Sequence, residues 1–259
     1  MRTAVISACF GAFRDEASNG IDFIDADPEI DYLFFTDDKK LRSTKWKVIF
    51  SECPADDMDH LSRARAAAKL AKFTVQDDYD AILWVDCKML VKNRRGVPPL
   101  SISATKVSHI LDSHPKCDVW SLFHWCRDHP LQELQATLQQ GLENPSYDTT
   151  LKQALASKSL TLSETCCLLY RTKSSVRRAF ARILDLIRQH KVRRDQNVFD
   201  LGTSDISCRK YFLCDVCSDQ SDFGRWVSRL HQVQRKMGVG SRFRSSGGLL
   251  SYRIFVPFG

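Results

Sequence analysis

The 259-residue sequence has no long hydrophobic run. No apolar stretch approaches the ~18 residues that a membrane-spanning helix needs. Residues Met1 to Thr3 lead directly into a short strand-like run, so the hydrophobic core and cleavage site of a signal peptide are missing as well. We find no internal repeat and no low-complexity block. These absences predict a soluble protein with a cytoplasmic location.

The cysteines do not form a recognisable zinc or disulfide framework, although there are ten of them. The chain is long enough to bury its own core, and Cys9, Cys166 and Cys167 lie inside apolar runs, so we expect buried free thiols. Cys214 and Cys217 form one zinc-type half-site, but no second half follows at a recognised spacing. Because structural zinc needs four ligands, no zinc site is predicted.

The net charge is +7, which fits a polyanionic partner, either a nucleic acid or a phosphorylated small molecule. With 43% hydrophobic and 27% charged residues, the composition suits one large globular domain or a domain with a small appendage. Beyond about Ser218 the sequence turns basic and glycine-rich. We therefore interpret residues 1–217 as the main domain and 218–259 as a basic C-terminal extension or lid packed on it.

Short apolar runs alternate with helical patterns along the chain. The patterns predict strands at Thr3 to Cys9, Asp31 to Phe35, Trp46 to Phe50, Ala81 to Val85, Val119 to Phe123 and Thr165 to Tyr170. They predict helices at Met58 to Phe73, Leu131 to Leu142 and Ser174 to His190. Such alternation argues for an α/β protein with a Rossmann-like, mostly parallel mixed sheet flanked by helices.

The strand at Ala81 to Val85 ends in Asp86 and, two residues later, Lys88. Ligands of open α/β sheets bind at the carboxyl ends of the strands, so both side chains are candidates for a binding site. In the preceding helix, Arg65, Lys69 and Lys72 are spaced four and three residues apart and share one face, with Arg63 near its edge. This basic row suits a diphosphate, or it is a solvated surface face.

Other polar residues stand at the ends of apolar elements. Asp37 with Thr36 follows the second strand, where a carboxylate can accept hydrogen bonds from ribose or a nucleobase; an ordinary turn is the alternative. Gly11 closes the first strand. Further candidates on the rims of the predicted elements are His124, Arg127, Glu164, Arg194, Asp195 and Gln196. Each of these could equally be a helix cap or part of a surface ion pair.

The order of these motifs resembles a known family. Five motifs follow one another between Arg65 and Phe199: R-x-x-x-K-x-x-K from Arg65, Y-D-x-x-x-W-x-D-x-K from Tyr79, H-x-x-R-D, L-x-x-x-E-x-x-x-x-x-x-R from Leu160, and R-D-Q. This pattern is similar to the putative GT-A-type glycosyltransferases of bacteria and plants, which include mucilage-related and turgor-regulation proteins. The resemblance implies a GT-A-like catalytic domain.

The resemblance also implies a nucleotide-diphosphate sugar, most often a UDP-sugar, bound across the carboxyl ends of the first strands. Lys88 stands where metal-dependent members carry the second aspartate of a D-x-D motif. Lys88, Arg65 and Lys69 would then neutralise the diphosphate, and Asp86 would hold ribose or sugar hydroxyls or contribute one ligand to Mn²⁺ or Mg²⁺. Gly11, Thr36, Asp37 and Arg63 complete the expected donor site.

The resemblance implies the transfer of a hexose or similar sugar to a hydroxyl of a glycan or polysaccharide, and we expect an inverting reaction with a carboxylate base. Asp195 is the first candidate for that base and Glu164 the second. His124, Arg127, Arg194 and Gln196 would bind acceptor or phosphate. In a retaining reaction Asp195 would instead position the sugar.

Two other functions compete with this interpretation. A sugar-nucleotide nucleotidyltransferase would need a glycine-rich basic loop after the first strand, and the segment from Gly11 to Arg14 is a poor one. A nucleic-acid-binding module could use the basic C-terminal segment, but its few aromatic residues are not interleaved with basic ones.

Overall fold

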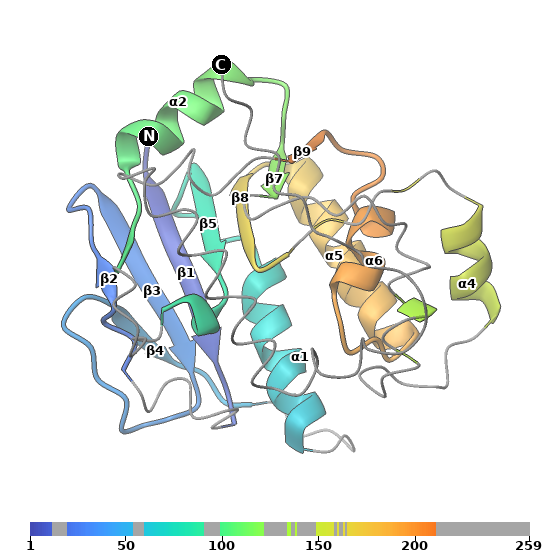
Figure 1. The fold of residues 1–259 in the computed structure, drawn as a ribbon, viewed down its shortest axis with the longest axis horizontal. Coiled ribbons are helices and arrows are strands. Elements are labelled where there is room, and N and C mark those ends of the chain that lie inside the picture. Colours follow the sequence, from blue (N-terminus) through green and yellow to red (C-terminus); the bar gives the residue numbers. More distant parts are fainter. Residues whose placement is uncertain are drawn as a thin grey trace, which may run out of the picture.

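A computed structural model of the chain (Figure 1) describes residues 1–11, 20–53, 60–90, 99–121, 134–135, 138, 149–157, 160, 163 and 165–210. At 60–62, 88, 149 and 209–210 only the backbone is described. Within this part of the chain, no helix is long and apolar enough to cross a membrane. Cys9, Cys166 and Cys167 are buried free thiols, as predicted. Residues 218–259, the predicted extension, lie outside the described residues, and so do Cys214 and Cys217.

The described strands form a mixed seven-stranded sheet in the order β4-β3-β1-β5-β8-β7-β9. The strands are β1 (Thr3–Cys9), β3 (Ile30–Thr36), β4 (Lys47–Phe50), β5 (Ala81–Val85), β7 (Val119–Ser121), β8 (Cys167–Arg171) and β9 (Cys208–Lys210). Only β8 runs antiparallel to its neighbours β5 and β7; all other pairs are parallel. Two short strands, β2 (Ile24–Asp25) and β6 (Leu100–Ser101), pair separately. The predicted mostly parallel mixed sheet is confirmed.

The described helices are α1 (His60–Phe73), the 3₁₀ turn η2 (Cys87–Met89), α2 (Ala104–Ser113), α4 (Thr149–Ala156), α5 (Ser174–Gln189) and α6 (Gln196–Gly202). The α1 and α5 helices match the predicted ones closely. Of the helix predicted at Leu131 to Leu142, only Leu134, Gln135 and Leu138 are described, and these are helical. Sequence patterns did not predict α2, α4, α6 or β9.

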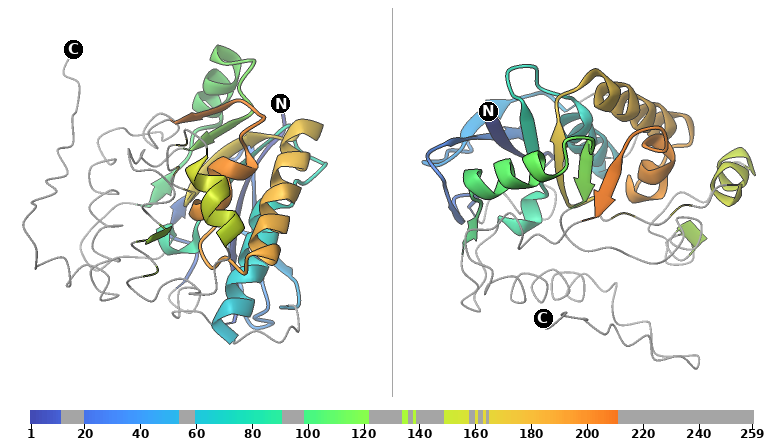
Figure 2. Two further views of the ribbon diagram at one scale, coloured as in Figure 1. Left: turned by 90° about the vertical axis from the view of Figure 1, so that its right-hand side faces the viewer. Right: turned by 90° about the horizontal axis from the view of Figure 1, so that it is seen from above.

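The helices cover both faces of the sheet, as Figure 2 shows. In β1, Ala4 and Ile6 point to the face packed by α1, α5 and α6, whereas Val5 and Cys9 point to the face packed by α2, η2 and the two-stranded sheet. This alternation is the period of two expected for a strand between two layers. Both faces of the central strands are therefore buried, which leaves the strand ends for ligands.

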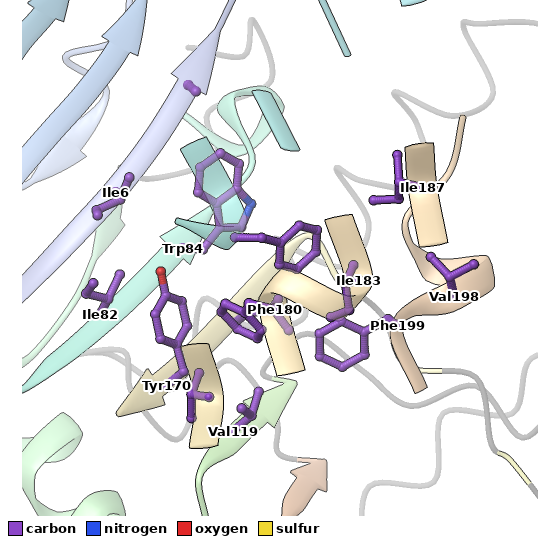
Figure 3. Packing of buried hydrophobic residues seen from close by; sticks show 14 of the residues in the cluster. Ile6, Ile82, Trp84, Val119, Tyr170, Phe180, Ile183, Ile187, Val198 and Phe199 are labelled. Carbon is purple, nitrogen blue, oxygen red and sulfur yellow. The ribbon is translucent and has the colours of Figure 1, made fainter. Parts of the chain in front are cut away.

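Aromatic rings fasten the end of α1 to α5 and β8. The ring of Phe180 packs edge-on against Tyr170 at 4.8 Å and against Phe73 at 5.2 Å between centroids, and Figure 3 shows Tyr170, Phe180 and Phe199 in one cluster. Edge-to-face pairs of this kind contribute about 0.5–1.5 kcal/mol each beyond the area that they bury. The cluster fixes the last turn of α1, and with it Lys72, next to the carboxyl end of β5.

Candidate functional site

The site region is the edge of the sheet where β1, β3 and β5 end side by side (Figure 1). The chain leaves β1 to form β3 on one side and later returns to form β5 on the other side. Between β1 and β5 the order of the strands therefore reverses, and in open α/β sheets ligands bind at such a switch point, beyond the carboxyl ends of the strands. Gly11, Asp37 and Asp86 follow the three strands at this edge.

The loops after β1 and β3 are held together by Asp37. Its two carboxylate oxygens accept hydrogen bonds from the backbone N–H of Gly11, at 2.9 and 3.0 Å. Gly11 has a φ of 66°, a conformation that a glycine adopts without strain. The hydroxyl of Thr36 accepts a hydrogen bond from the N–H of Asp38 at 3.1 Å. These contacts are those of the turn alternative, and the predicted contact of Asp37 with a nucleotide stays a prediction.

Asp86 follows β5 directly, and its carboxylate is held by groups on the α1 face of the sheet. The indole N–H of Trp84 donates a hydrogen bond to Oδ1 at 2.8 Å, and the ammonium of Lys72 lies 3.8 Å from the same oxygen. The backbone N–H of Asp86 donates to the carbonyl of Cys166 at 2.8 Å. The side chain is 29% exposed, so this fixed carboxylate is open to solvent.

Lys72 is the charged group that connects two carboxylates at this edge. Its side chain is only 4% exposed, and Nζ lies 2.7 Å from Oδ2 of Asp195 and 3.8 Å from Oδ1 of Asp86. The ammonium also lies 5.6 Å from the centre of the Trp84 ring and 5.5 Å from that of Phe73. Burial alone would lower the pKa of Lys72, but the charges of Asp195 and Asp86 outweigh it and raise the pKa, so the group stays protonated.

Asp195 stands at the start of α6 and is the second partner of Lys72. Its side chain is 15% exposed. Burial alone would raise its pKa, but the charges of Lys72 and Lys69 and hydrogen bonds from Lys72 and Thr165 outweigh it and lower the pKa to about 2. At neutral pH Asp195 is therefore a carboxylate that two cationic side chains stabilise.

Two lysines of the basic row of α1 are buried and do not form an open face. Lys69 is 8% exposed, and its ammonium donates to the carbonyls of Arg193 at 2.6 Å and Val192 at 3.5 Å. Lys69 and Lys72 thus point inward and tie α1 to the segment that precedes α6. The solvated-face alternative is wrong for these two lysines, and the predicted contact of Lys69 with a diphosphate would require these backbone contacts to be given up.

The remaining predicted residues are partly placed. Arg63 and Arg65 are half-buried on α1. The guanidinium of Arg194 donates a hydrogen bond to the side-chain carbonyl of Gln196 at 2.6 Å, so these two residues contact each other. Lys88 lies in η2, with its backbone alone described. Glu164, His124 and Arg127 lie outside the described residues.

Comparisons with known proteins give a likeness in structure only. No family model matches the sequence, and no curated protein matches it in sequence. Mouse xyloside xylosyltransferase 1, in its apo form, aligns over 82% of this chain and 85% of its own, with a TM-score of 0.43 and 10% identity. Core-mannan synthase A from Aspergillus fumigatus, in an Mn/GDP form, aligns over 83% of this chain and 73% of its own, with a TM-score of 0.45 and 12% identity.

A third similar structure is a 4-diphosphocytidyl-2C-methyl-D-erythritol synthase from Anaerococcus prevotii. It aligns over 89% of this chain and 96% of its own, with a TM-score of 0.38 and 8% identity. At these scores and identities, function has to be argued from the side chains at the sheet edge.

One of the two predicted roles of Asp86 is that of a ligand to a divalent metal ion. Among the described residues, no group of three or more His, Cys, Asp or Glu side chains could hold a metal ion. In addition, Oδ1 of Asp86 already accepts the Trp84 hydrogen bond and faces the Lys72 ammonium, whose charge opposes that of a cation. The described residues by themselves therefore do not fit a divalent cation.

Proposed function

We propose that the chain is a glycosyltransferase that moves a hexose or similar sugar from a nucleotide-diphosphate sugar, a UDP-sugar by preference, to a hydroxyl of a glycan or polysaccharide. The observation that carries this proposal is the carboxylate of Asp86, held by Trp84 and Lys72 at the switch point of the sheet. A fixed, solvent-open carboxylate accepts hydrogen bonds from pairs of sugar or ribose hydroxyls, and this edge is where α/β sheets bind nucleotides. The order of motifs from Arg65 to Phe199 supports the same reaction.

The reaction requires the acceptor oxygen to bond to the anomeric carbon while the bond to the nucleoside diphosphate breaks. In the inverting form, a carboxylate base takes the proton of the acceptor hydroxyl. Asp195, with a pKa of about 2, is a weak base for this step, because a base works best with a pKa near the working pH. Glu164 keeps its predicted role as the other candidate.

The first test is a binding and hydrolysis screen with UDP-, GDP- and TDP-sugars, with and without Mn²⁺. We expect one class of donor to bind and to be hydrolysed slowly or transferred. A nucleoside diphosphate should raise the melting temperature, and single-stranded DNA should not. If the chain neither binds nor turns over any donor, the proposal fails, and stabilisation by DNA alone would favour the nucleic-acid-binding alternative.

A matched pair of variants tests the site. Asp86→Asn should weaken donor binding by about tenfold or more, because hydrogen bonds to a charged carboxylate contribute about 1.5–3 kcal/mol. Asp80 is the control, since it stands just before the amino end of the same strand, where it accepts a hydrogen bond from the backbone of Arg2 at 2.7 Å. Asp80→Asn should leave donor affinity unchanged. Equal affinities for both variants and the wild type would remove Asp86 from the donor site.

A further inference from the structure

We propose that Lys72 and Asp195 form a positioning pair that holds the carboxylate of Asp86 for the donor, and that Asp195 acts through Lys72 instead of taking a proton from the acceptor. The inference rests on the proposed function, because Asp86 has to contact the donor for its position to affect transfer. It adds Lys72 to the site and gives Asp195 a different role from the base that the sequence predicts.

The geometry is a chain of three charged groups from three elements. Asp195, at the start of α6, lies 2.7 Å from the ammonium of Lys72, which comes from the last turn of α1. The same ammonium lies 3.8 Å from Asp86 at the end of β5. Both carboxylates therefore lie within 4 Å of one nitrogen, whose positive charge offsets the repulsion between the two like charges.

Two of these three charged groups, Asp195 and Lys72, are anchored to the core by neighbouring residues. The carbonyl of Asp195 accepts backbone hydrogen bonds from Val198 at 3.1 Å and Phe199 at 2.9 Å, and these two side chains are fully or almost fully buried in the core. Phe73, next to Lys72, packs against the same core. A ligand-contacting group works best when rigid elements and a supporting shell hold it, and the described residues supply that shell on the α1 face of Asp86.

Lys72 is placed to support the carboxylate of Asp86 and not to bind the donor itself. With 4% of its side chain exposed and two carboxylates within 4 Å of its ammonium, it presents little surface to a diphosphate. Asp195, at 15% exposure, is about half as open as Asp86 at 29%. Of the two carboxylates that flank Lys72, Asp86 is therefore the more exposed one and Asp195 is the more buried one.

The variant Asp195→Asn separates the two roles by a split between binding and turnover. If Asp195 is a positioning residue, we expect donor affinity to fall by about tenfold or more and kcat to change less. The loss of a residue that supports a binding group typically has an effect of this size on affinity. A base role predicts the opposite, namely a kcat lower by about 10²-fold or more with donor affinity kept within a few-fold. The second result, or no change in either quantity, overturns the inference.

The control variant is Asp200→Asn on the same helix. Asp200 accepts hydrogen bonds from the backbone and hydroxyl of Ser163, at 2.8 and 2.5 Å, so the variant alters a carboxylate of the same helix whose hydrogen bonds go to Ser163. Asp200→Asn should leave donor affinity within about twofold, the change expected for a residue outside the chain of three. A loss of affinity equal to that of Asp195→Asn would show a general effect of α6 and overturn the inference.

A ligand-free measurement keeps the inference apart from the proposed function. The indole N–H of Trp84 donates to Asp86, so its NMR resonance, assigned by its loss in Trp84→Phe, reports the position of that carboxylate. We expect this resonance to move in Asp195→Asn and to stay in place in Asp200→Asn. If Asp195→Asn lowers affinity and kcat together, a moved resonance supports the inference and an unmoved one overturns it. If the wild type binds no donor, the proposed function fails while this signal still tests the positioning.

Discussion

The substitution Lys72→Met tests the buried charges at the sheet edge most directly. Methionine keeps an unbranched apolar stem against Trp84 and Phe73, so the main change is the loss of the ammonium. Asp195, 2.7 Å from that ammonium and 15% exposed, then keeps a charge with its nearest cation removed. Removal of one partner of a buried ion pair costs about 3–5 kcal/mol, because the other charge stays desolvated. This is a large part of the roughly 5–15 kcal/mol that stabilises a typical domain.

The measurement is the free energy of unfolding in urea, compared with two further variants. Lys173→Met removes an ammonium at 3.1 Å from Asp118, but this lysine is 48% exposed, so the cost should stay below about 1 kcal/mol. In Lys72→Met/Asp195→Asn the orphaned charge is gone, and the double variant should be more stable than the sum of the single effects by about 1 kcal/mol or more. A cost for Lys72→Met no larger than that for Lys173→Met, or strictly additive effects, would refute the reasoning.

Two further predictions concern acid and close packing. Because the pKa of Asp195 is lowered to about 2 in the folded chain, against an unfolded value of ~3.9, its contribution of about 2 kcal/mol is present above pH ~4 and lost as the pH falls towards 2. Urea midpoints should therefore fall less on acidification in Asp195→Asn than in the wild type; equal slopes would contradict the pairing with Lys72. In α6, a Cβ added to Gly202 would lie 3.3 Å from Cα of Ile183 on α5, so Gly202→Ala should cost about 1–3 kcal/mol by overpacking. An unchanged melting temperature would show that the two helices can separate at no cost.

The layer architecture was predictable because it depends on local patterns. The run at Thr3 to Cys9 is apolar on both sides, as a strand buried between two layers must be, and Ser174 to His190 has one apolar face. The direction of β8 was not predictable, since an apolar run reads the same for a parallel and an antiparallel strand. Helix α6 was missed because its side chains are buried on nearly all sides, so no amphipathic period marks it.

The site was predictable only in part, because its contacts are distant in sequence. Asp86 could be singled out as an acidic residue directly after a buried strand. Lys72 belonged to a basic row on α1, but its contact with Asp195 joins residues 123 positions apart, which no local spacing reveals. The direction in which the basic side chains of α1 point also depends on the segments that pack against this helix. Lys69 and Lys72 turn inward because carbonyls and a carboxylate near α6 lie there to receive them.

The charges at the edge also limit what the described residues can do for a diphosphate. Asp86 and Asp195 carry two negative charges, and Lys72 and Lys69 carry two positive ones that contact Asp195, Asp86 and backbone carbonyls. The group is thus close to neutral, with a carboxylate at its exposed end. Such an end is suited to neutral hydroxyl donors and repels phosphate. In the proposed reaction the charge of the departing nucleoside diphosphate would therefore have to be met by other cations, and Lys88 in η2, two residues after Asp86, is the predicted residue nearest in sequence to supply it.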